Sequence, residues 1–195
     1  GYVTQECGNL YAFTYERSFN LLTKIGCSGL IVPLSLVSTE RMRDLQEQLI
    51  STNKMLWFSL FDVYPTKLFD GAKQRLSICI TSNKNQTNTM YSTKYNRWSS
   101  EERDTLFPKI VYSKTRYDGD LSAFPKYGSA LAASIQEKIS SKKKSIYVES
   151  KKRISFFVHR IPYNFVKAIN FIPYFWNEID GEKKSEDYKP YYLND

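Results

Sequence analysis

The chain has 195 residues, of which 42 % are hydrophobic and 25 % charged, so it has enough apolar material to bury a core. Its 28 Lys and Arg residues against 20 Asp and Glu residues give a formal net charge of +8, and its apolar runs are far too short to span a bilayer. These values exclude a disordered tail and a transmembrane protein. The first residues also lack the basic start and apolar core of a secretory signal.

The number and spacing of the cysteines and histidines limit which disulfides, metal sites and catalytic sites the chain can form. The cysteines, Cys7, Cys27 and Cys79, are odd in number and widely spaced, which argues against a disulfide framework and against a Cys-x-x-Cys metal site. The single histidine, His159, leaves no material for a His-based triad or a multi-histidine metal site, and we interpret it as a surface or strand residue. We therefore expect no metal, no membrane association and a reducing, cytoplasmic setting.

Aromatic residues reach 15 %, and a basic chain rich in aromatics has the composition that neutralises phosphates and stacks on bases. The alternative is that the aromatics fill a core. Nucleic acid is the leading partner on this evidence.

Helical spacing predicts a first helix that begins after Asn9, a good N-cap, and ends at Gly26. The continuous apolar run at residues 29–34 predicts a central strand covered on both faces in a parallel sheet. A second, amphipathic helix is expected from Ser38 or Thr39 to about Ile50.

Further strands are predicted at residues 55–61 and 76–81, which makes an α/β order. Three strands are fewer than the roughly five to seven of a doubly wound sheet, so the chain looks like part of a larger protein.

Residues 82–120 are polar and irregular, and a short strand at 109–112 is the one element expected there. Leu131, Ile135 and Ile139 recur at four-residue spacing and predict a helix over about 125–140. A basic connector follows, then a strand at 154–158, and we place a boundary near residue 141.

Several blocks resemble a known family. Residues 9–22 read Asn-Leu-Tyr-Ala-Phe-Thr-Tyr-Glu-Arg-Ser-Phe-Asn-Leu-Leu, residues 29–33 Gly-Leu-Ile-Val-Pro, residues 41–45 Arg-Met-Arg-Asp-Leu and residues 68–77 Leu-Phe-Asp-Gly-Ala-Lys-Gln-Arg-Leu-Ser. This succession resembles the downstream half of the catalytic domain of adenine-N6 DNA methyltransferases of restriction-modification systems, of the fused type II or type I-like kind. In that family the strand after the first helix ends in proline, and a later phenylalanine precedes a final strand hairpin.

Residues 163–174 and 184–189 look like the opening of the family's target-recognition region. The resemblance implies an α/β fold with a partial Rossmann-like methyltransferase sheet, comprising the last three strands and their helices, followed by a small mixed α+β segment. It divides the chain into residues 1–140, the downstream half of the catalytic domain, and residues 141–195, the basic connector and the start of the recognition region.

The resemblance also implies roles for individual residues. Phe69 matches the aromatic that stacks on the flipped adenine, a role with a physical basis because the base must leave the duplex to react. The alternative is that Phe69 anchors its loop beneath the hairpin. Lys73, Gln74 and Arg75 follow in the same loop, where they contact DNA phosphates or merely face water.

Leu10, Phe13 and Thr14 match positions that lie against the adenosine of S-adenosylmethionine, with helix packing as the alternative. The family often has an aromatic at the place of Thr14, whereas here the aromatic is Phe13. The cofactor's glycine turn and the Asn-Pro-Pro-Tyr loop are absent from the sequence, and Ile-Pro-Tyr at 161–163 and 172–174 does not replace that loop. We therefore expect this chain alone to be inactive and not to bind S-adenosylmethionine, with the N-terminal half of the catalytic domain as its missing partner.

A basic cluster suggests contacts with double-stranded DNA, or else a solvated linker. It comprises Lys142, Lys143, Lys144, Lys151, Lys152, Arg153 and Arg160.

The leading hypothesis is part of an S-adenosylmethionine-dependent, base-flipping DNA adenine methyltransferase. The alternatives are a non-catalytic nucleic-acid-binding module, in which Phe69 is dispensable, and a methyltransferase acting on RNA or on protein glutamine. A partial sheet would leave an exposed edge, so we also expect self-association or instability.

Overall fold

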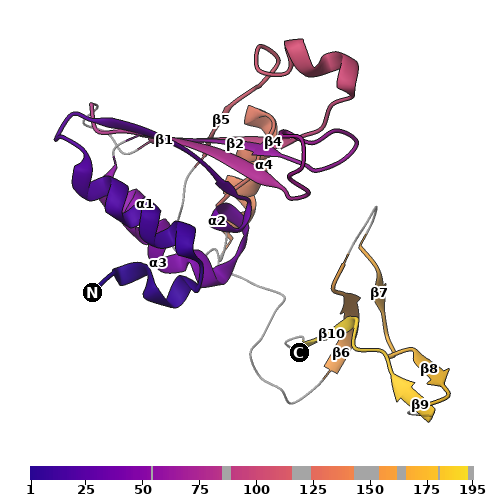
Figure 1. Cartoon of the computed structure of the whole chain (residues 1–195). Helices are drawn as coiled ribbons and strands as arrows, with labels where there is room; N and C mark the ends of the chain where they lie inside the picture. Colours follow the sequence, from indigo (N-terminus) through magenta and orange to yellow (C-terminus); the bar gives the residue numbers. More distant parts are fainter. Residues whose placement is uncertain are drawn as a thin grey trace. The chain divides into compact units, whose positions relative to one another are not determined.

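A computed structural model of the chain describes residues 1–53, 55–84, 89–115, 124–142, 154–161, 166–179 and 181–192. Contacts divide the chain into two units, Gly1–Lys138 and Ile139–Asp195 (Figure 1). The division falls close to the boundary expected near residue 141. The assignment of the two parts to a catalytic domain and a recognition region stays a prediction.

The first unit is built on a five-stranded mixed sheet in the order β1-β3-β2-β4-β5. Strand β3 runs antiparallel to both of its neighbours, β1 and β2. Strands β2 and β4 are parallel to each other, and β5 is antiparallel to β4. The strands are β1 (Cys27–Pro33), β2 (Met55–Phe61), β3 (Leu76–Ser82), β4 (Thr89–Asn96) and β5 (Ser113–Thr115). The helices are η1 (Val3–Cys7), α1 (Leu10–Leu21), α2 (Ser35–Ser38), η2 (Glu40–Met42), α3 (Arg43–Thr52), η3 (Ser100–Thr105) and α4 (Ala130–Ser140).

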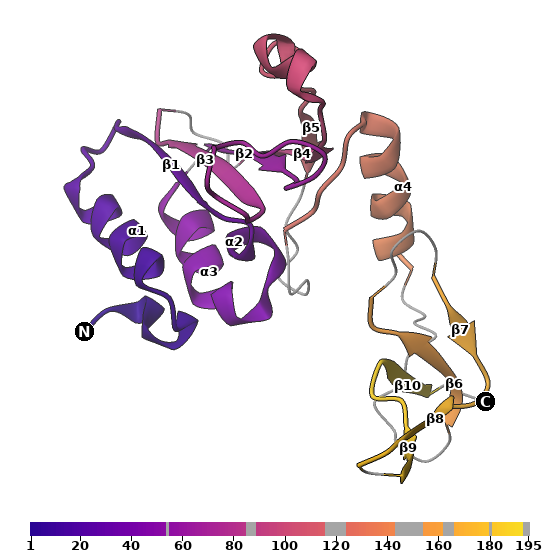
Figure 2. The same ribbon diagram turned by 45° about the vertical axis from the view of Figure 1, so that its right-hand side comes forward.

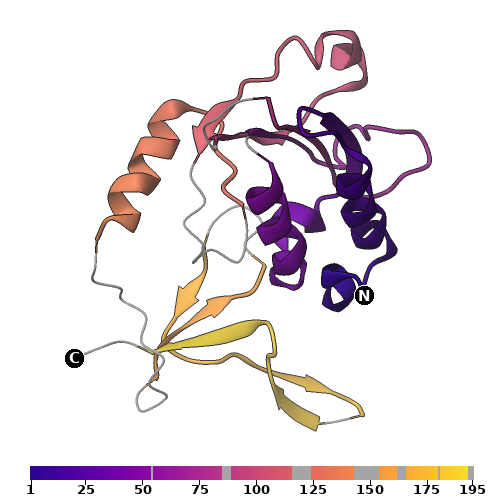
Figure 3. The same ribbon diagram turned by 90° about the vertical axis from the view of Figure 1, so that its left-hand side faces the viewer.

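The main core lies between this sheet and the helices α1, α2 and α3, which gather on the same face of it (Figures 1 and 3). The amphipathic pattern of α3 is the cause, because Leu45 and Leu49 are fully buried while Arg43 and Glu47 pair on the exposed side. From the sheet, Phe58 packs against Phe124 with ring centroids 4.9 Å apart. The predicted mixed α/β fold class is confirmed.

Local signals located the ends of some helices but not all. The Asn9 side chain accepts a hydrogen bond from the Tyr11 backbone N–H at 3.2 Å, so the predicted N-cap is confirmed. The helix ends at Leu21, however, and Gly26 lies in a turn before β1, where its N–H donates to the Thr23 carbonyl. The predicted end at Gly26 is therefore wrong.

The helix expected from Ser38 or Thr39 to about Ile50 is present as η2 followed directly by α3, and Thr39 occupies the N-cap position with an extended backbone, φ −120° and ψ 127°. The short helix α2 precedes it and was not expected. The buried Gln46 side chain of α3 donates to the Leu36 carbonyl of α2 at 2.8 Å and joins the two helices.

The expectation that residues 29–34 form a central strand of a parallel sheet is wrong. Among the described residues β1 pairs with β3 alone, and antiparallel, because β3 lies between β1 and β2. Only one face of β1 is covered: Val32 is 6 % exposed, whereas Ile31 is 49 % exposed. A continuous apolar run does not distinguish such a strand from one covered on both faces.

Residues 82–120 hold two strands that sequence patterns did not indicate, β4 and β5. Strand β4 is rich in polar residues, yet Ser92 and Thr93 are fully buried, and Thr93 Oγ1 accepts a hydrogen bond from the Leu60 N–H at a bulge. The strand expected at residues 109–112 is absent; Ile110 instead packs against a second small core.

The second unit contains a three-stranded sheet in the order β10-β6-β7 and a separate hairpin, β8–β9 (Figure 2). Its strands are β6 (Ile154–His159), β7 (Ala168–Ile169), β8 (Tyr174–Asn177), β9 (Gly181–Lys184) and β10 (Tyr188–Tyr192). Aromatic pairs join β6 to β10: Phe156 stacks on Tyr191, and His159 meets Tyr188 edge to face with centroids 4.9 Å apart. The strand predicted at residues 154–158 is confirmed, and His159 lies in it as expected.

A buried carboxylate ties η1 to α1. The Glu16 carboxylate accepts hydrogen bonds from the Val3 N–H at 3.0 Å, the Thr4 N–H at 2.9 Å and the Thr4 hydroxyl at 2.7 Å. Burial alone would raise the pKa of Glu16, but these donors favour the ionised form and lower its pKa below the ordinary value. Glu16 therefore stabilises the fold only while it is ionised.

This arrangement predicts a loss of stability in acid. A carboxylate whose pKa is lower in the folded state contributes stability above its unfolded pKa of about 4.5, and that stability is lost as pH falls through the folded pKa. Glu16→Gln should therefore flatten the decline in melting temperature between neutral pH and the range below 4.5. Glu47→Gln, which removes an exposed carboxylate of α3, is the control. Equal pH profiles for the two variants would contradict the prediction.

Candidate nucleic-acid interface

One end of the five-stranded sheet gathers most of the candidate chemistry of the first unit. The parallel strands β2 and β4 both end there, and β3 begins there. Asp62 directly follows β2, Arg97 directly follows β4, and Arg75 directly precedes β3. The loop of residues 62–75 joins β2 to β3 and carries Phe69. The strand order therefore brings Arg97 next to the loop that carries Phe69 and Arg75.

Asp62 links the three segments. Its carboxylate is 4 % exposed and accepts from Arg75 Nε at 2.8 Å on one oxygen and from Arg97 Nε at 2.7 Å on the other. The Val63 N–H also donates to it. Burial alone would raise the pKa of Asp62, but the hydrogen bonds from Arg75, Val63 and Arg97 lower it below the ordinary value. Asp62 is therefore an ionised, buried anchor for two cationic side chains.

The loop that carries Phe69 is held by its neighbour Leu68. Leu68 is 7 % exposed and belongs to a small core with Phe61, Leu76, Trp98 and Leu106. Arg103 of η3 donates to the Lys67 carbonyl at 3.2 Å and to the Leu68 carbonyl at 2.8 Å. Leu68 and Arg103 together fix the backbone beside Phe69.

Phe69 itself lies at the surface, with 43 % of its area exposed. A turn follows it, in which Gly71 has φ +83° and the Ala72 N–H donates to the Phe69 carbonyl. The alternative role for Phe69 was to anchor its loop beneath the hairpin, and Leu68 is the residue buried in that way. The next two candidate residues, Lys73 and Gln74, are exposed as well. The ring of Phe69 is thus accessible on a fixed loop.

The three residues matched to the cofactor lie on one outward face of α1. Leu10 is 80 % exposed and Thr14 is also exposed. The Phe13 ring packs against the Tyr2 ring, with ring centroids 5.3 Å apart. This face lies opposite the buried side of the helix, formed by Ala12, Tyr15 and Glu16. An outward face of this kind does not by itself enclose the adenosine of S-adenosylmethionine, so these residues alone do not fit the cofactor.

The basic cluster of the second unit is described only in part. Lys142 and Arg160 are exposed, and the Arg160 N–H donates to the Asp187 carbonyl at 2.7 Å. The remaining members lie outside the described residues; they are Lys143, Lys144, Lys151, Lys152 and Arg153.

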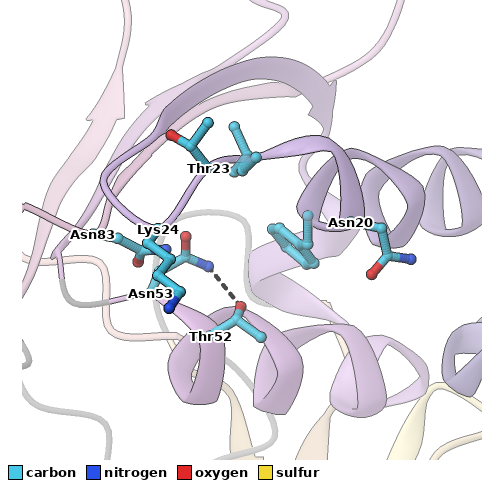
Figure 4. Close-up of a pocket in the computed structure, with 8 residues that line it drawn as sticks. Asn20, Thr23, Lys24, Thr52, Asn53 and Asn83 are labelled. Carbon is cyan, nitrogen blue, oxygen red and sulfur yellow. Dashed lines mark hydrogen bonds between the residues drawn. The ribbon is translucent and has the colours of Figure 1, made fainter.

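A shallow pocket of about 220 Å³ lies at the opposite end of the sheet, where β1 and β2 begin and β3 ends. Figure 4 shows polar side chains around it, with the Asn53 amide donating to the Thr52 hydroxyl at 2.9 Å. Its lining residues are Phe19, Asn20, Leu22, Thr23, Lys24, Thr52, Asn53 and Asn83. None of the residues predicted to bind cofactor or DNA lines this pocket.

Sequence patterns did not indicate Asp62, Arg97 and Arg103, which lie at the end of the sheet that carries the Phe69 loop. Arg97 and Arg103 fall in residues 82–120, where the strand that positions Arg97 was not predicted. An aspartate immediately after a buried strand was the one available signal for Asp62.

Comparisons with known proteins found similar folds among solved structures but no matching family. No protein-family model matches the chain, and no curated protein matches it. A nuclease-deletion mutant of the Type ISP restriction-modification enzyme LlaGI, solved with a DNA substrate mimic, matches 77 % of this chain with a TM-score of 0.51 and 13 % identity. A cryo-EM structure of a DrdV–DNA complex matches 56 % of it with a TM-score of 0.44 and 12 % identity.

The chain spans only 13 % of the length of the LlaGI structure and 12 % of that of DrdV. At this identity the likeness to LlaGI shows a shared fold. Among the described residues, no helix has the length and apolar character needed to cross a membrane.

Proposed function

We propose that the chain is a DNA-contacting part of a restriction-modification enzyme, and more specifically the downstream part of the catalytic domain of an adenine-N6 DNA methyltransferase with the start of its target-recognition region. The observation that carries the proposal is the β2–β3 hairpin, whose fixed loop presents Phe69 at the surface. The sequence resemblance expects a phenylalanine before a final strand hairpin, whereas Phe69 lies in the loop within the β2–β3 hairpin. The fold shared with part of LlaGI supports the same assignment.

In this proposal Phe69 stacks on a flipped adenine, while Lys73 and Arg75 contact the DNA backbone. Bound to the whole enzyme, S-adenosylmethionine would supply the methyl group that the adenine amino nitrogen accepts. Leu10, Phe13 and Thr14 become part of the cofactor site only when another part of the protein adds the glycine turn and the Asn-Pro-Pro-Tyr loop. The chain alone is therefore expected to contact DNA without methylating it.

DNA binding by the 195-residue chain is the first test. A fluorescein-labelled duplex titrated at several salt concentrations should bind, with log K falling linearly against log salt at about 0.9 per phosphate neutralised. Sedimentation of the same sample also tests self-association through the edge of β1 that has no partner among the described residues. Absence of duplex binding at low salt would contradict the proposed function, and methyl transfer by the chain alone would contradict its inactivity.

The alternative function, a non-catalytic nucleic-acid-binding module, also predicts salt-sensitive binding. It is favoured by the exposed basic residues alone and needs no stacking aromatic. The two functions differ at Phe69, which is dispensable in a binding module and required in a methyltransferase.

A further inference from the structure

Arg75, the last residue of the Phe69 loop, and Arg97, which follows β4, are held by the same side chain. Both donate their Nε–H groups to one buried carboxylate, that of Asp62, at 2.8 and 2.7 Å. Their side chains nevertheless remain 55 % and 67 % exposed. Each guanidinium has five N–H donors, and among the described residues no other hydrogen bond or ion pair engages the terminal amino groups of these two.

The backbone around this pair is fixed before any ligand arrives. The Asp62 N–H donates to the Asn96 carbonyl at 3.0 Å, and the Asn96 side chain donates to the Leu60 carbonyl at 2.9 Å. These bonds join the ends of β2 and β4, so Asp62 and Arg97 keep their spacing. Groups held in place lose less conformational entropy on binding than free side chains do.

Charge accounting favours an anion at this place. Two guanidinium groups against the Asp62 carboxylate leave a net positive charge, and the other charged residues of the loop cancel only in part, since Lys67 and Lys73 stand against Asp70. Each guanidinium presents a fork of terminal N–H groups. Two such forks suit a phosphate, which has several acceptor oxygens, better than a group with one acceptor atom. Exposed aromatic rings lie in the adjoining segments, at Tyr64 and Phe69. Arginine forks beside accessible rings are the combination that holds a nucleic-acid strand.

We propose that Arg75 and Arg97, oriented by Asp62, clamp one phosphodiester group of the DNA strand whose base approaches Phe69. The inference rests on the proposed function and adds Arg97 and Asp62 to it. Asp62 is a positioning residue, because its carboxylate contacts the arginines and not the phosphate. Arg75 and Arg97 are binding residues for the backbone, and they carry no base specificity.

The test measures duplex binding by Arg75→Gln/Arg97→Gln against wild type across a salt series. Loss of the clamp should weaken binding by about tenfold or more at low salt and reduce the salt slope by about 1. The matched control is Arg17→Gln/Arg43→Gln, which removes the same charge from exposed positions of α1 and α3. If both double variants bind DNA equally well, the clamp is overturned and the proposed function stands.

A second variant guards against misfolding, since removing both arginines leaves the Asp62 carboxylate buried without a cation. Arg75→Lys/Arg97→Lys keeps the charges but loses the forked geometry. It should fold, as judged by circular dichroism, and bind DNA more weakly than wild type at equal net charge. Wild-type affinity in this folded variant would overturn the clamp, because positive charge alone would then account for DNA binding.

Arginine side-chain NMR separates failure of the clamp from failure of the proposed function. Addition of inorganic phosphate should shift the Nε–Hε signals of Arg75 and Arg97 and leave those of Arg17 and Arg43 in place. If these signals shift but wild type binds no duplex, the anion site stands and the proposed function fails, together with DNA as the ligand. If neither phosphate nor duplex shifts them, the clamp itself is overturned.

Discussion

If the proposed function holds, Phe69→Ala should lower the rate of adenine methylation by the assembled enzyme by about 5- to 150-fold, while duplex binding stays near the wild-type value. Stacking of a base on an aromatic ring contributes on the order of 1 to 3 kcal/mol, and in the proposed function it acts only after the base has left the duplex. The Phe69 ring is 43 % exposed and its loop is held by Leu68 and Arg103, so truncation removes a contact surface and not a core. Methyl incorporation into adenine-containing DNA is the measurement.

Conservative and matched variants make this result specific. Phe69→Tyr keeps an aromatic face and should retain most of the activity, whereas Phe69→Leu keeps apolar volume and should not. Phe107→Ala removes another exposed phenylalanine, 57 % accessible, from the segment after η3. Full activity in Phe69→Ala would contradict stacking and favour the binding-module alternative.

Phe58→Ala should destabilise the first unit by about 3 to 5 kcal/mol, the usual cost of emptying a buried phenylalanine site. Phe58 lies in the middle of β2, is fully buried, and packs at 4.9 Å against Phe124 from a segment far along the chain. The loss combines the apolar area returned to water with a cavity that the neighbouring strands β3 and β4 cannot close. Urea unfolding followed by circular dichroism gives the free energy of unfolding.

Phe69→Ala provides the control for stability as well, because it makes the same change at a half-exposed position. It should cost less than about 1 kcal/mol. Comparable losses in the two variants would mean that Phe69 is a structural anchor, and would weaken its assignment as a stacking residue at the same time.

Short-range signals in the sequence located several elements correctly. The Asn9 cap, the strands at 55–61 and 76–81 and the strand at 154–158 depend on the side chains within each segment, on capping chemistry and on β-branched and aromatic content. The exposed loop with Phe69 follows from the same reasoning, since a polar, glycine-containing stretch separates two apolar strands.

Neighbours far along the chain decided the rest. β1 lies at an edge of the described sheet because β3 inserts between it and β2, and a one-dimensional pattern carries no information about that order. β4 was hidden because only Met90 of its buried positions is apolar, and the others, Ser92 and Thr93, have hydroxyl groups that find partners only in the folded chain.

By itself, then, the sequence determined the α/β class, the strands β1, β2 and β3 of the first unit and the surface loop that carries Phe69. Only the tertiary structure decided that Asp62, Arg75 and Arg97 meet. They lie at the ends of three different strands, and Arg97 is 35 positions from Asp62 in the chain. A buried carboxylate needs hydrogen-bond donors or cations around it, and which arginines supply them to Asp62 depends on the strand order that brings those ends together.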